Sequence, residues 1–170
     1  QSSIKWSKRR LQDSITTIAL KDNLKEELQQ LKQNNKYIVL DVAGRDSAEF
    51  RSALLTADVL IIPTQPSQTD IEVLPFVLRL VNTAKQVNKN LKTFVVLNKA
   101  PTNNKSTEID AALELLQQVK SVKTLNTILR DRKQFRDAMI EGKSVLEMGS
   151  SKAKDELNEL VNQCIQKIKR

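Results

Sequence analysis

The stretch ADVLIIPTQPSQTDIEVLPFVLRLVNTAKQVNKNLKTFVVLNKA, residues 57–100, contains the pattern that decides the fold. VLIIP (59–63) and TFVVLNKA (93–100) are continuous apolar runs, which are typical of strands in a sheet covered on both faces. Between them, apolar residues at 71, 74, 77, 78 and 81 follow the helical period, and Pro75 indicates either a helix start or a kink. A strand, a helix and a second strand in this order predict a parallel pair.

The pattern continues on both sides of this stretch. YIVLDVA (37–43) and VKTLNTIL (122–129) predict two further strands, and Leu24, Leu28 and Leu31 recur at helical spacing near the start of the chain. Ile15 and Ile18 precede those leucines at spacings compatible with the same helix. Further helices are predicted at 47–57 with Ser47 or Asp46 as N-cap, at 106–119 with a capping box, at 135–148 with an interruption at Gly142, and at 151–170. The sequence therefore predicts an α/β fold with a mostly parallel sheet, helices on both faces, and one domain over residues 1–170.

Composition excludes several classes of function. The 170 residues contain no histidine and one cysteine, which excludes histidine-based catalysis, an intrachain disulfide and nearly every kind of zinc site. Apolar runs are too short to span a bilayer, and the final helix lacks large aromatics on its apolar face, so we expect a soluble cytoplasmic protein that binds no membrane. The net charge of +8 favours polyanionic partners, or it provides a solubilising surface.

The candidate site consists of residues that end the predicted strands, because ligands of parallel sheets bind beyond the carboxyl ends of the strands. Asp41 and Gly44 form an Asp-x-x-Gly pattern. In one interpretation Asp41 orients Mg²⁺ through water and the Gly44 N–H faces a terminal phosphate; in the other, Asp41 caps the next segment and Gly44 turns the chain. Asn98 and Lys99 close another strand, where the Asn98 amide either reads a base edge or simply ends the strand.

Basic residues gather in three places, and few aromatic residues accompany them. Such clusters suit contact with a phosphate backbone and not sequence readout, or they form a solvated face. The first place is the N-terminal run Lys8, Arg9 and Arg10, preceded by Lys5. The residues assigned to DNA binding are Arg130, Arg132, Lys133 and Arg136 in the second cluster, and Lys152 and Lys154 in the third.

The order of these pieces resembles the ParA/MinD family of partition ATPases, and in particular the short ParA-type proteins of plasmids. ADVLIIPTQPSQTD (57–70) is similar to the family segment AADLVIIPVQPSPLD. The opening QSSIKW resembles the end of the family's D-x-D-x-Q-x-S segment. The family pattern R-x-x-F-R-x-A-x-x-x-G-x-S-V-x-E is carried by Arg132, Phe135, Arg136, Ala138, Gly142, Ser144, Val145 and Glu147.

The resemblance implies a P-loop NTPase fold, yet the sequence has three glycines and no GxxxxGK[ST] pattern. In this family the deviant Walker A loop and the first strand come before the D-x-D-x-Q-x-S segment. We therefore expect the phosphate loop and the N-terminal strand to precede Gln1. A degenerate member without a phosphate loop is the alternative.

The resemblance also implies a function: a partition ATPase acting in plasmid or chromosome segregation, located on the nucleoid in the cytoplasm. It implies binding of ATP or ADP with Mg²⁺, ATP-dependent homodimerisation, non-specific DNA binding and a ParB-like centromere-binding partner. Asp41 would orient Mg²⁺ or the attacking water, Gly44 would sense the γ-phosphate, and Asn98 would contact adenine with Lys99 beside it. The arginine-rich second cluster would contribute to the DNA surface or to the nucleotide edge of the dimer. The rival hypothesis is a DNA- or protein-binding α/β module that works without nucleotide.

Overall fold

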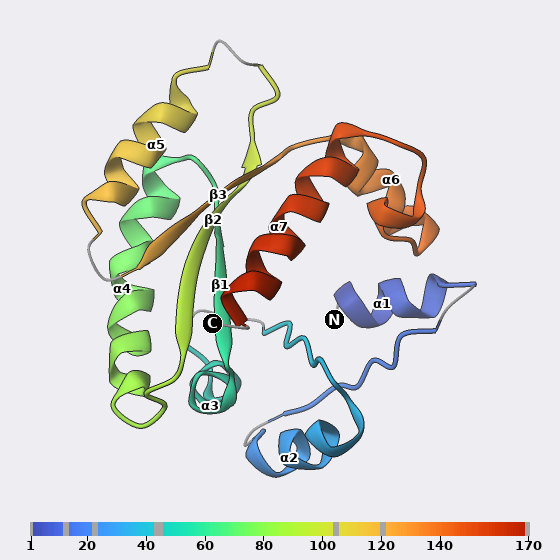
Figure 1. Cartoon of the computed structure of the whole chain (residues 1–170), viewed down its shortest axis with the longest axis vertical. Helices are drawn as coiled ribbons and strands as arrows, with labels where there is room; N and C mark the ends of the chain where they lie inside the picture. Colours follow the sequence, from blue (N-terminus) through green and yellow to red (C-terminus); the bar gives the residue numbers. More distant parts are fainter. Residues whose placement is uncertain are drawn as a thin grey trace.

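The computed structural model confirms an α/β fold built on a three-stranded parallel sheet in the order β1-β2-β3 (Figure 1). β1 (Val59–Thr64) and β3 (Lys123–Arg130) both pair in parallel with β2 (Lys92–Ala100). The crossovers between successive strands contain α4 (Gln68–Lys85) and α5 (Glu108–Gln117). β2 is the central strand, and Val95, Val96 and Leu97 within it are at most 1% exposed. The structure describes residues 2–11, 14–21, 24–42, 46–103, 106–119 and 122–168.

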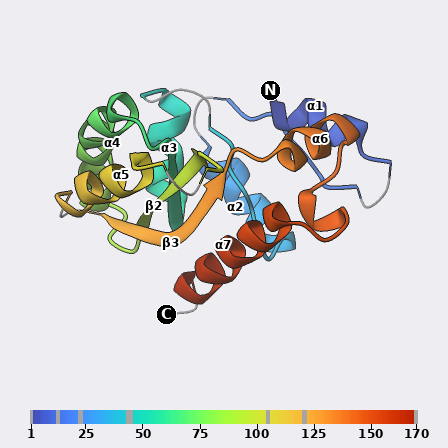
Figure 2. The same ribbon diagram turned by 90° about the horizontal axis from the view of Figure 1, so that it is seen from above.

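Helices cover both faces of the sheet (Figure 2). On one face Val95 and Leu97 of β2 pack with apolar residues of α4 and α5. On the other face Phe94 and Val96 of β2 and Leu125 of β3 pack against Leu160 and Cys164 of α7 (Lys152–Ile168). The side chains of a strand point alternately to its two faces, so a strand that is buried on both sides must be apolar throughout. This explains the continuous apolar run that predicted β2.

Two helices begin at serine caps, and the sequence indicated the first of them, Ser47. The Ser47 hydroxyl accepts a hydrogen bond from the Phe50 N–H at the start of α3 (Ala48–Thr56), and the Ser67 hydroxyl accepts one from the Asp70 N–H at the start of α4. α4 begins seven residues before Pro75 and continues through it. The capping box predicted for α5 could start at Ser106 or Thr107: Thr107 makes no side-chain hydrogen bond to the helix, whereas the Ser106 hydroxyl accepts one from the Glu108 N–H at 3.3 Å.

The strand predicted at 37–43 is wrong for its described part, 37–42, which forms neither strand nor helix. Alternate side chains of this segment, Ile38, Leu40 and Val42, pack on α2 (Lys25–Asn34) and α3, as they would in a strand. The side chains between them face solvent, with Val39 91% exposed. A strand needs a neighbour for its backbone N–H and C=O groups. Within the described residues the sheet has only three strands, and none of them pairs with this segment.

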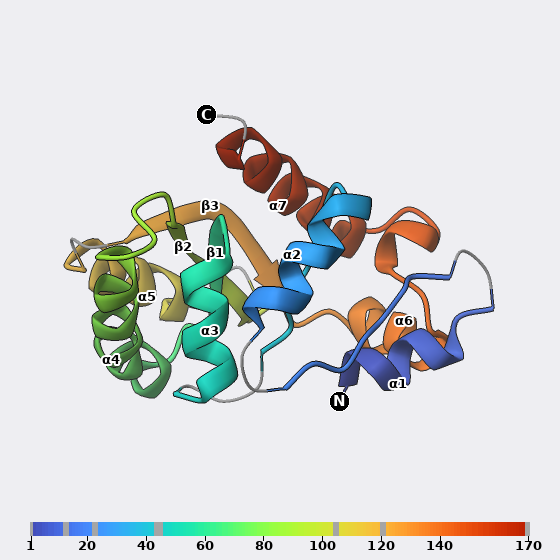
Figure 3. The same cartoon turned by 90° about the horizontal axis from the view of Figure 1, so that it is seen from below.

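A second group of helices lies beside the sheet. α6 (Lys133–Glu141) ends at Gly142, whose φ of 66° is left-handed, and the short 3₁₀ helix η1 (Val145–Glu147) follows. This confirms the predicted interruption at Gly142. The helix α1 (Ser2–Arg9), which the sequence pattern did not predict, packs against α6 (Figure 3). Of the helix predicted from the early apolar residues, only α2 forms: Ile15 and Ile18 lie in an irregular segment and are about half exposed.

Candidate functional site

The carboxyl end of β2 departs from regular strand geometry at the predicted residues Asn98 and Lys99. Between the pairs Leu97–Ile128 and Ala100–Arg130, β2 advances by three residues and β3 by two, so β2 contains an extra residue. Among the described residues, Lys99 is the only non-glycine residue with a positive φ, at 52°. Its side chain is exposed, whereas Asn98 is half-buried. Bulges of this kind redirect side chains at the ends of strands and are frequent beside functional sites.

Asp41 lies in the unpaired extended segment and faces solvent. The Ser3 hydroxyl, in the first turn of α1, donates a hydrogen bond to Asp41 Oδ2 across 38 positions of sequence. No hydrogen bond or ion pair in the described part of the chain joins Asp41 to Asn98 or Lys99. The predicted site residues therefore do not contact one another directly. Gly44, the fourth residue predicted to contact nucleotide or metal, lies outside the described residues.

The arginines of the second basic cluster are tied to a carboxylate of α7. Arg132 donates to Glu156 Oε1 from Nε at 3.0 Å and from Nη2 at 2.7 Å, and the Arg130 backbone N–H donates to Oε2 at 3.1 Å. The Arg130 guanidinium donates to the Pro101 carbonyl at 2.7 Å and lies 3.9 Å from Glu156. All three side chains are less than a quarter exposed. These contacts fix the carboxyl end of β3 between α7 and the loop after β2.

Of the remaining predicted DNA-binding residues, Lys133, Arg136 and Lys152 are exposed, whereas Lys154 is half-buried. Lys133 pairs with Asp137 at 2.7 Å, and Arg136 pairs with Asp131 at 2.5 Å. Lys154 donates to the Met148 carbonyl at 3.2 Å. Lys152 is exposed and has no ion-pair partner among the residues that the structure describes. The four cations of the second cluster thus face three carboxylates, Glu156, Asp137 and Asp131, and their charge is largely compensated locally.

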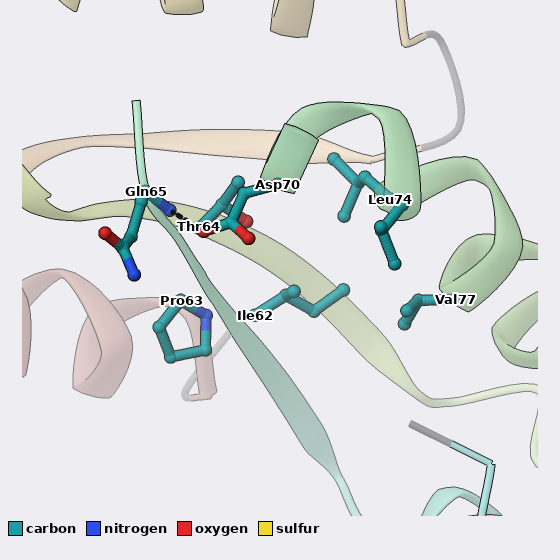
Figure 4. A pocket seen from close by; sticks show the side chains of 8 residues that line it. Ile62, Pro63, Thr64, Gln65, Asp70, Leu74 and Val77 are labelled. Atoms are coloured by element: carbon teal, nitrogen blue, oxygen red, sulfur yellow. Dashed lines mark hydrogen bonds between the residues drawn. The ribbon is translucent and has the colours of Figure 1, made fainter. Parts of the chain in front are cut away.

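A small cavity of about 210 Å³ lies between β1 and the first half of α4 (Figure 4). At its polar end the Gln65 N–H donates to the Asp70 carboxylate at 3.3 Å, and Thr64 lies beside them. The rest of the lining is Ile62, Pro63, Val73, Leu74 and Val77. Pockets for drug-sized ligands and cofactors usually measure about 300–1,000 Å³, so this cavity alone is too small for a nucleotide.

The described residues form neither a membrane span nor a metal cluster. No described helix combines the length and the apolar character needed to cross a bilayer. The described His, Cys, Asp and Glu side chains nowhere form a group of three or more that could hold a metal ion. Mg²⁺ is commonly bound through one or two carboxylates together with substrate phosphates, and a single carboxylate such as Asp41 therefore suits it.

Two curated proteins are similar in sequence to the chain. One is the maintenance of carboxysome distribution protein A of Halothiobacillus neapolitanus, 27% identical over 143 residues, which cover 82% of the chain and 65% of that protein. The other is the sporulation initiation inhibitor protein Soj of Bacillus subtilis, 24% identical over 135 residues, which cover 78% of the chain and 52% of that protein. A family model described as an AAA domain, AAA_31, matches residues 3–95, more than half of the chain. The chain belongs to this AAA domain family.

This membership and the two relatives confirm the resemblance to the ParA/MinD P-loop ATPases that the motifs indicated. The residues matched to the AAA domain include both Ser3 and Asp41. Sequence reasoning had not assigned a role to Ser3, although the Gln1-x-Ser3 spacing in QSSIKW had placed it in a family segment. It also missed Glu156, because a single carboxylate on a polar helix does not differ in sequence from any other exposed charge. The chain spans 65% and 52% of the lengths of the two curated relatives.

Proposed function

We propose that this AAA domain is the ATPase module of a partition or positioning protein. The observation that carries the proposal is the AAA domain match over residues 3–95, which contains the Asp41 carboxylate together with the Ser3 hydroxyl bonded to it. One relative is named for maintaining the distribution of carboxysomes, which is a task of cargo placement. By analogy, the module acts in plasmid or chromosome segregation, dimerises with ATP, coats DNA as the dimer, and is released when a ParB-like partner stimulates hydrolysis.

The residues of the candidate site fit a nucleotide with Mg²⁺. The bound ATP·Mg²⁺ supplies the phosphoryl group and the positive charge that stabilises its transfer. Asp41, exposed and hydrogen-bonded on one oxygen, is available to hold a water of the metal shell or to orient the attacking water. Asn98 offers both donors and an acceptor to a base edge, and Lys99 adds an exposed cation beside it. We also propose that the Gly44 N–H contacts the terminal phosphate of the nucleotide.

The proposed DNA surface is non-specific and centres on α7. Lys152 is exposed at the start of that helix, and Lys154 is the next cation along it. Arg130 and Arg132 stabilise the fold through Glu156. They therefore contribute to the positive electrostatic potential of the surface more than to direct contacts with DNA. Lys133 and Arg136 are already paired with carboxylates, so each can bind a DNA phosphate only by giving up its carboxylate partner. Binding of this type places the protein on the nucleoid in the cytoplasm.

A steady-state ATPase assay of the full-length protein, with parallel nucleotide titrations, tests the proposal. We expect Asp41→Asn to lower kcat by about 100-fold and to change nucleotide affinity far less, because the carboxylate acts mainly as charge develops on the phosphoryl group. The control is Asp110→Asn, an exposed carboxylate on α5. Unchanged turnover in Asp41→Asn would remove this residue from the mechanism. DNA binding without nucleotide, in a protein that hydrolyses no ATP, would instead favour the nucleotide-independent module.

A further inference from the structure

α1 is attached to the C-terminal end of α6 by side chains that donate to backbone carbonyls. Arg9 Nη1 donates to the Met139 carbonyl at 3.0 Å, and the Trp6 indole N–H donates to the Lys143 carbonyl at 3.0 Å. Met139 is among the last four residues of α6, whose carbonyls lack partners within the helix, and Lys143 lies just beyond it; the two donors satisfy these acceptors. We call the segment of residues 139–147, which contains these acceptors, the α6–η1 turn.

Arg10, the residue directly after α1, provides a paired contact to this turn. Its Nη2 and Nη1 atoms donate to the two carboxylate oxygens of Glu147 at 2.6 and 2.9 Å, and Nη1 also reaches the Gly142 carbonyl at 3.2 Å. The guanidinium also lies 4.9 Å from the centre of the Trp6 ring. Only 5% of the Arg10 side chain is exposed. A planar guanidinium matched to both oxygens of a carboxylate fixes direction as well as distance.

Gly142 allows the helix to approach this closely. A Cβ atom at this position would lie 2.6 Å from the Arg9 carbonyl carbon and 2.8 Å from the Arg10 nitrogen. Both are backbone atoms, which cannot swing away as the tip of a side chain can. The glycine of the R-x-x-F-R-x-A-x-x-x-G-x-S-V-x-E pattern therefore has two roles here: it adopts the left-handed φ that ends α6, and it leaves room for the backbone after α1.

The opposite end of α1 carries the hydroxyl that contacts Asp41. Ser3 lies in the first turn of this eight-residue helix, Arg9 is its last residue, and Arg10 follows it. At a rise of 1.5 Å per residue the helix is about 12 Å long, short enough to behave as one rigid piece. A carboxylate near a helix N-terminus is favourable, and α1 has no acidic residue in its own first turn.

We propose that α1 is a rigid link through which the α6–η1 turn positions the Asp41 carboxylate, with Ser3 as the positioning residue. The inference rests on the proposed function in so far as Asp41 acts on nucleotide or metal. It assigns a purpose to the G-x-S-V-x-E part of the sequence pattern: Gly142 and Glu147 lie about a hundred residues from Asp41 in sequence, yet they hold the helix that orients it. Ser3 and Asp41 form the contact, and Arg10 with Glu147 maintains it.

The first test follows the link itself and needs no activity. Trp6 is the only tryptophan of the 170 residues and contacts the turn, so its quenching by acrylamide reports the attachment of α1. In the full-length protein, with any tryptophan elsewhere replaced by phenylalanine, we compare Ser3→Ala, Asp41→Asn and the double variant. We expect each single change to raise the quenching constant about twofold, and the double variant to exceed neither, because the two changes remove one contact. Glu147→Gln and Gly142→Asn should raise it further, and Asn keeps access to the left-handed φ. Asp137→Asn, on α6 outside this turn and paired with Lys133, is the matched control.

The second test measures ATP hydrolysis by the same variants. We expect Ser3→Ala to lower kcat about tenfold with little change in KM, Ser3→Thr to restore it, and Glu147→Gln combined with Ser3→Ala to be no slower than Ser3→Ala alone. Additive effects of Ser3→Ala and Glu147→Gln on kcat would overturn the inference. So would an unchanged quenching constant of Trp6 in both Ser3→Ala and Asp41→Asn. If the wild-type protein hydrolyses no ATP, the proposed function fails, and the quenching experiment alone still decides whether α1 links the turn to Asp41.

Discussion

Arg10 and Glu147, 137 positions apart in the sequence, form an ion pair with two parallel hydrogen bonds. Glu147 also accepts a hydrogen bond from the Ser144 N–H at 2.6 Å, which completes the capping box of η1. One carboxylate thus organises its own turn and holds the first helix of the chain on it. The contact joins two segments far apart in the sequence, as expected if residues 1–170 act as one domain.

The attachment of α1 should depend on pH in a defined window. Hydrogen bonds from Arg10, and secondarily from the Ser144 N–H, lower the pKa of Glu147 from 4.5 to about 2. A carboxyl with a lowered folded-state pKa stabilises fully above its unfolded value, and this stabilisation is lost as the pH falls from 4.5 towards 2. We therefore expect the difference in free energy of unfolding between wild type and Glu147→Gln to be constant above pH 4.5 and to vanish near pH 2. Urea titrations followed by Trp6 fluorescence measure it. A difference that grows on acidification would contradict the assignment.

Glu156 should be a main determinant of stability. It accepts hydrogen bonds from the Arg132 guanidinium and from the Arg130 backbone, and its side chain is only 15% exposed. Removing it leaves two half-buried guanidinium groups with less compensation, so we expect Glu156→Ala to lower the free energy of unfolding by about 3 kcal/mol. The control Glu159→Ala, three residues further on α7, should cost less than about 0.5 kcal/mol. Chemical denaturation of both variants tests this, and equal losses would show that the ion pairs add little.

Replacing Lys99 by glycine should raise the free energy of unfolding, whereas the same change at an ordinary strand residue lowers it. Its φ of 52° lies in the left-handed region, where a side chain costs roughly 1–2 kcal/mol. Lys99→Gly should therefore raise the free energy of unfolding by about 0.5–1 kcal/mol, after the entropy cost of glycine is subtracted. Lys123→Gly, at the exposed start of β3, should lower it. If the left-handed backbone at Lys99 helps to bind the nucleotide, the more stable Lys99→Gly variant will bind ATP more weakly in a calorimetric titration.

DNA affinity should depend on the lysines of α7. Reversing Lys152 and Lys154 to glutamate should weaken binding to any duplex by a similar factor, and should flatten the slope of log K against log salt by roughly 0.9 for each phosphate that the protein no longer neutralises. Fluorescence anisotropy on two unrelated duplexes over a salt series measures both quantities. The same reversal at Lys85, the last residue of α4, and at Lys89, just beyond it, is the control. Reversal at Arg132 and Lys133 is a poorer probe, because it also breaks the bonds to Glu156. A marked preference for one duplex would argue against backbone-only contact.

Much of the sheet could be predicted from the sequence because its signals are local. β1, β2 and β3 appear within one or two residues of the apolar runs, and the Ser47 and Ser67 caps follow from side-chain chemistry a few residues away. Pro75 was ambiguous because a helix can tolerate a proline near its start, and α4 shows that it lies inside the helix. In each of these cases the decisive interaction lies within one turn or one strand.

The rest depended on distant partners. The segment 37–42 has the right alternation for a strand, but pairing depends on a neighbour that its own residues cannot specify. Arg130 and Arg132 looked like free cations because Glu156 lies 24 positions or more away on another helix. Likewise, nothing in QSSIKWSKRR indicates that Ser3 and Arg10 contact Asp41 and Glu147. The roles of Gly44, Asn98 and Lys99 stay predictions.

The packing of α7 on the sheet has a consequence for synthesis of the protein. Leu160 and Cys164 cover Phe94, Val96 and Leu125, so this face of the sheet stays open until residues 152–168 have been translated. The strands β1, β2 and β3 are therefore synthesised before the helix that covers this apolar face. At a translation rate of about 5–20 residues per second the exposure lasts a few seconds. During that interval the side chains of Phe94 and Leu125 lack their cover from α7, which makes the unfinished protein prone to aggregation.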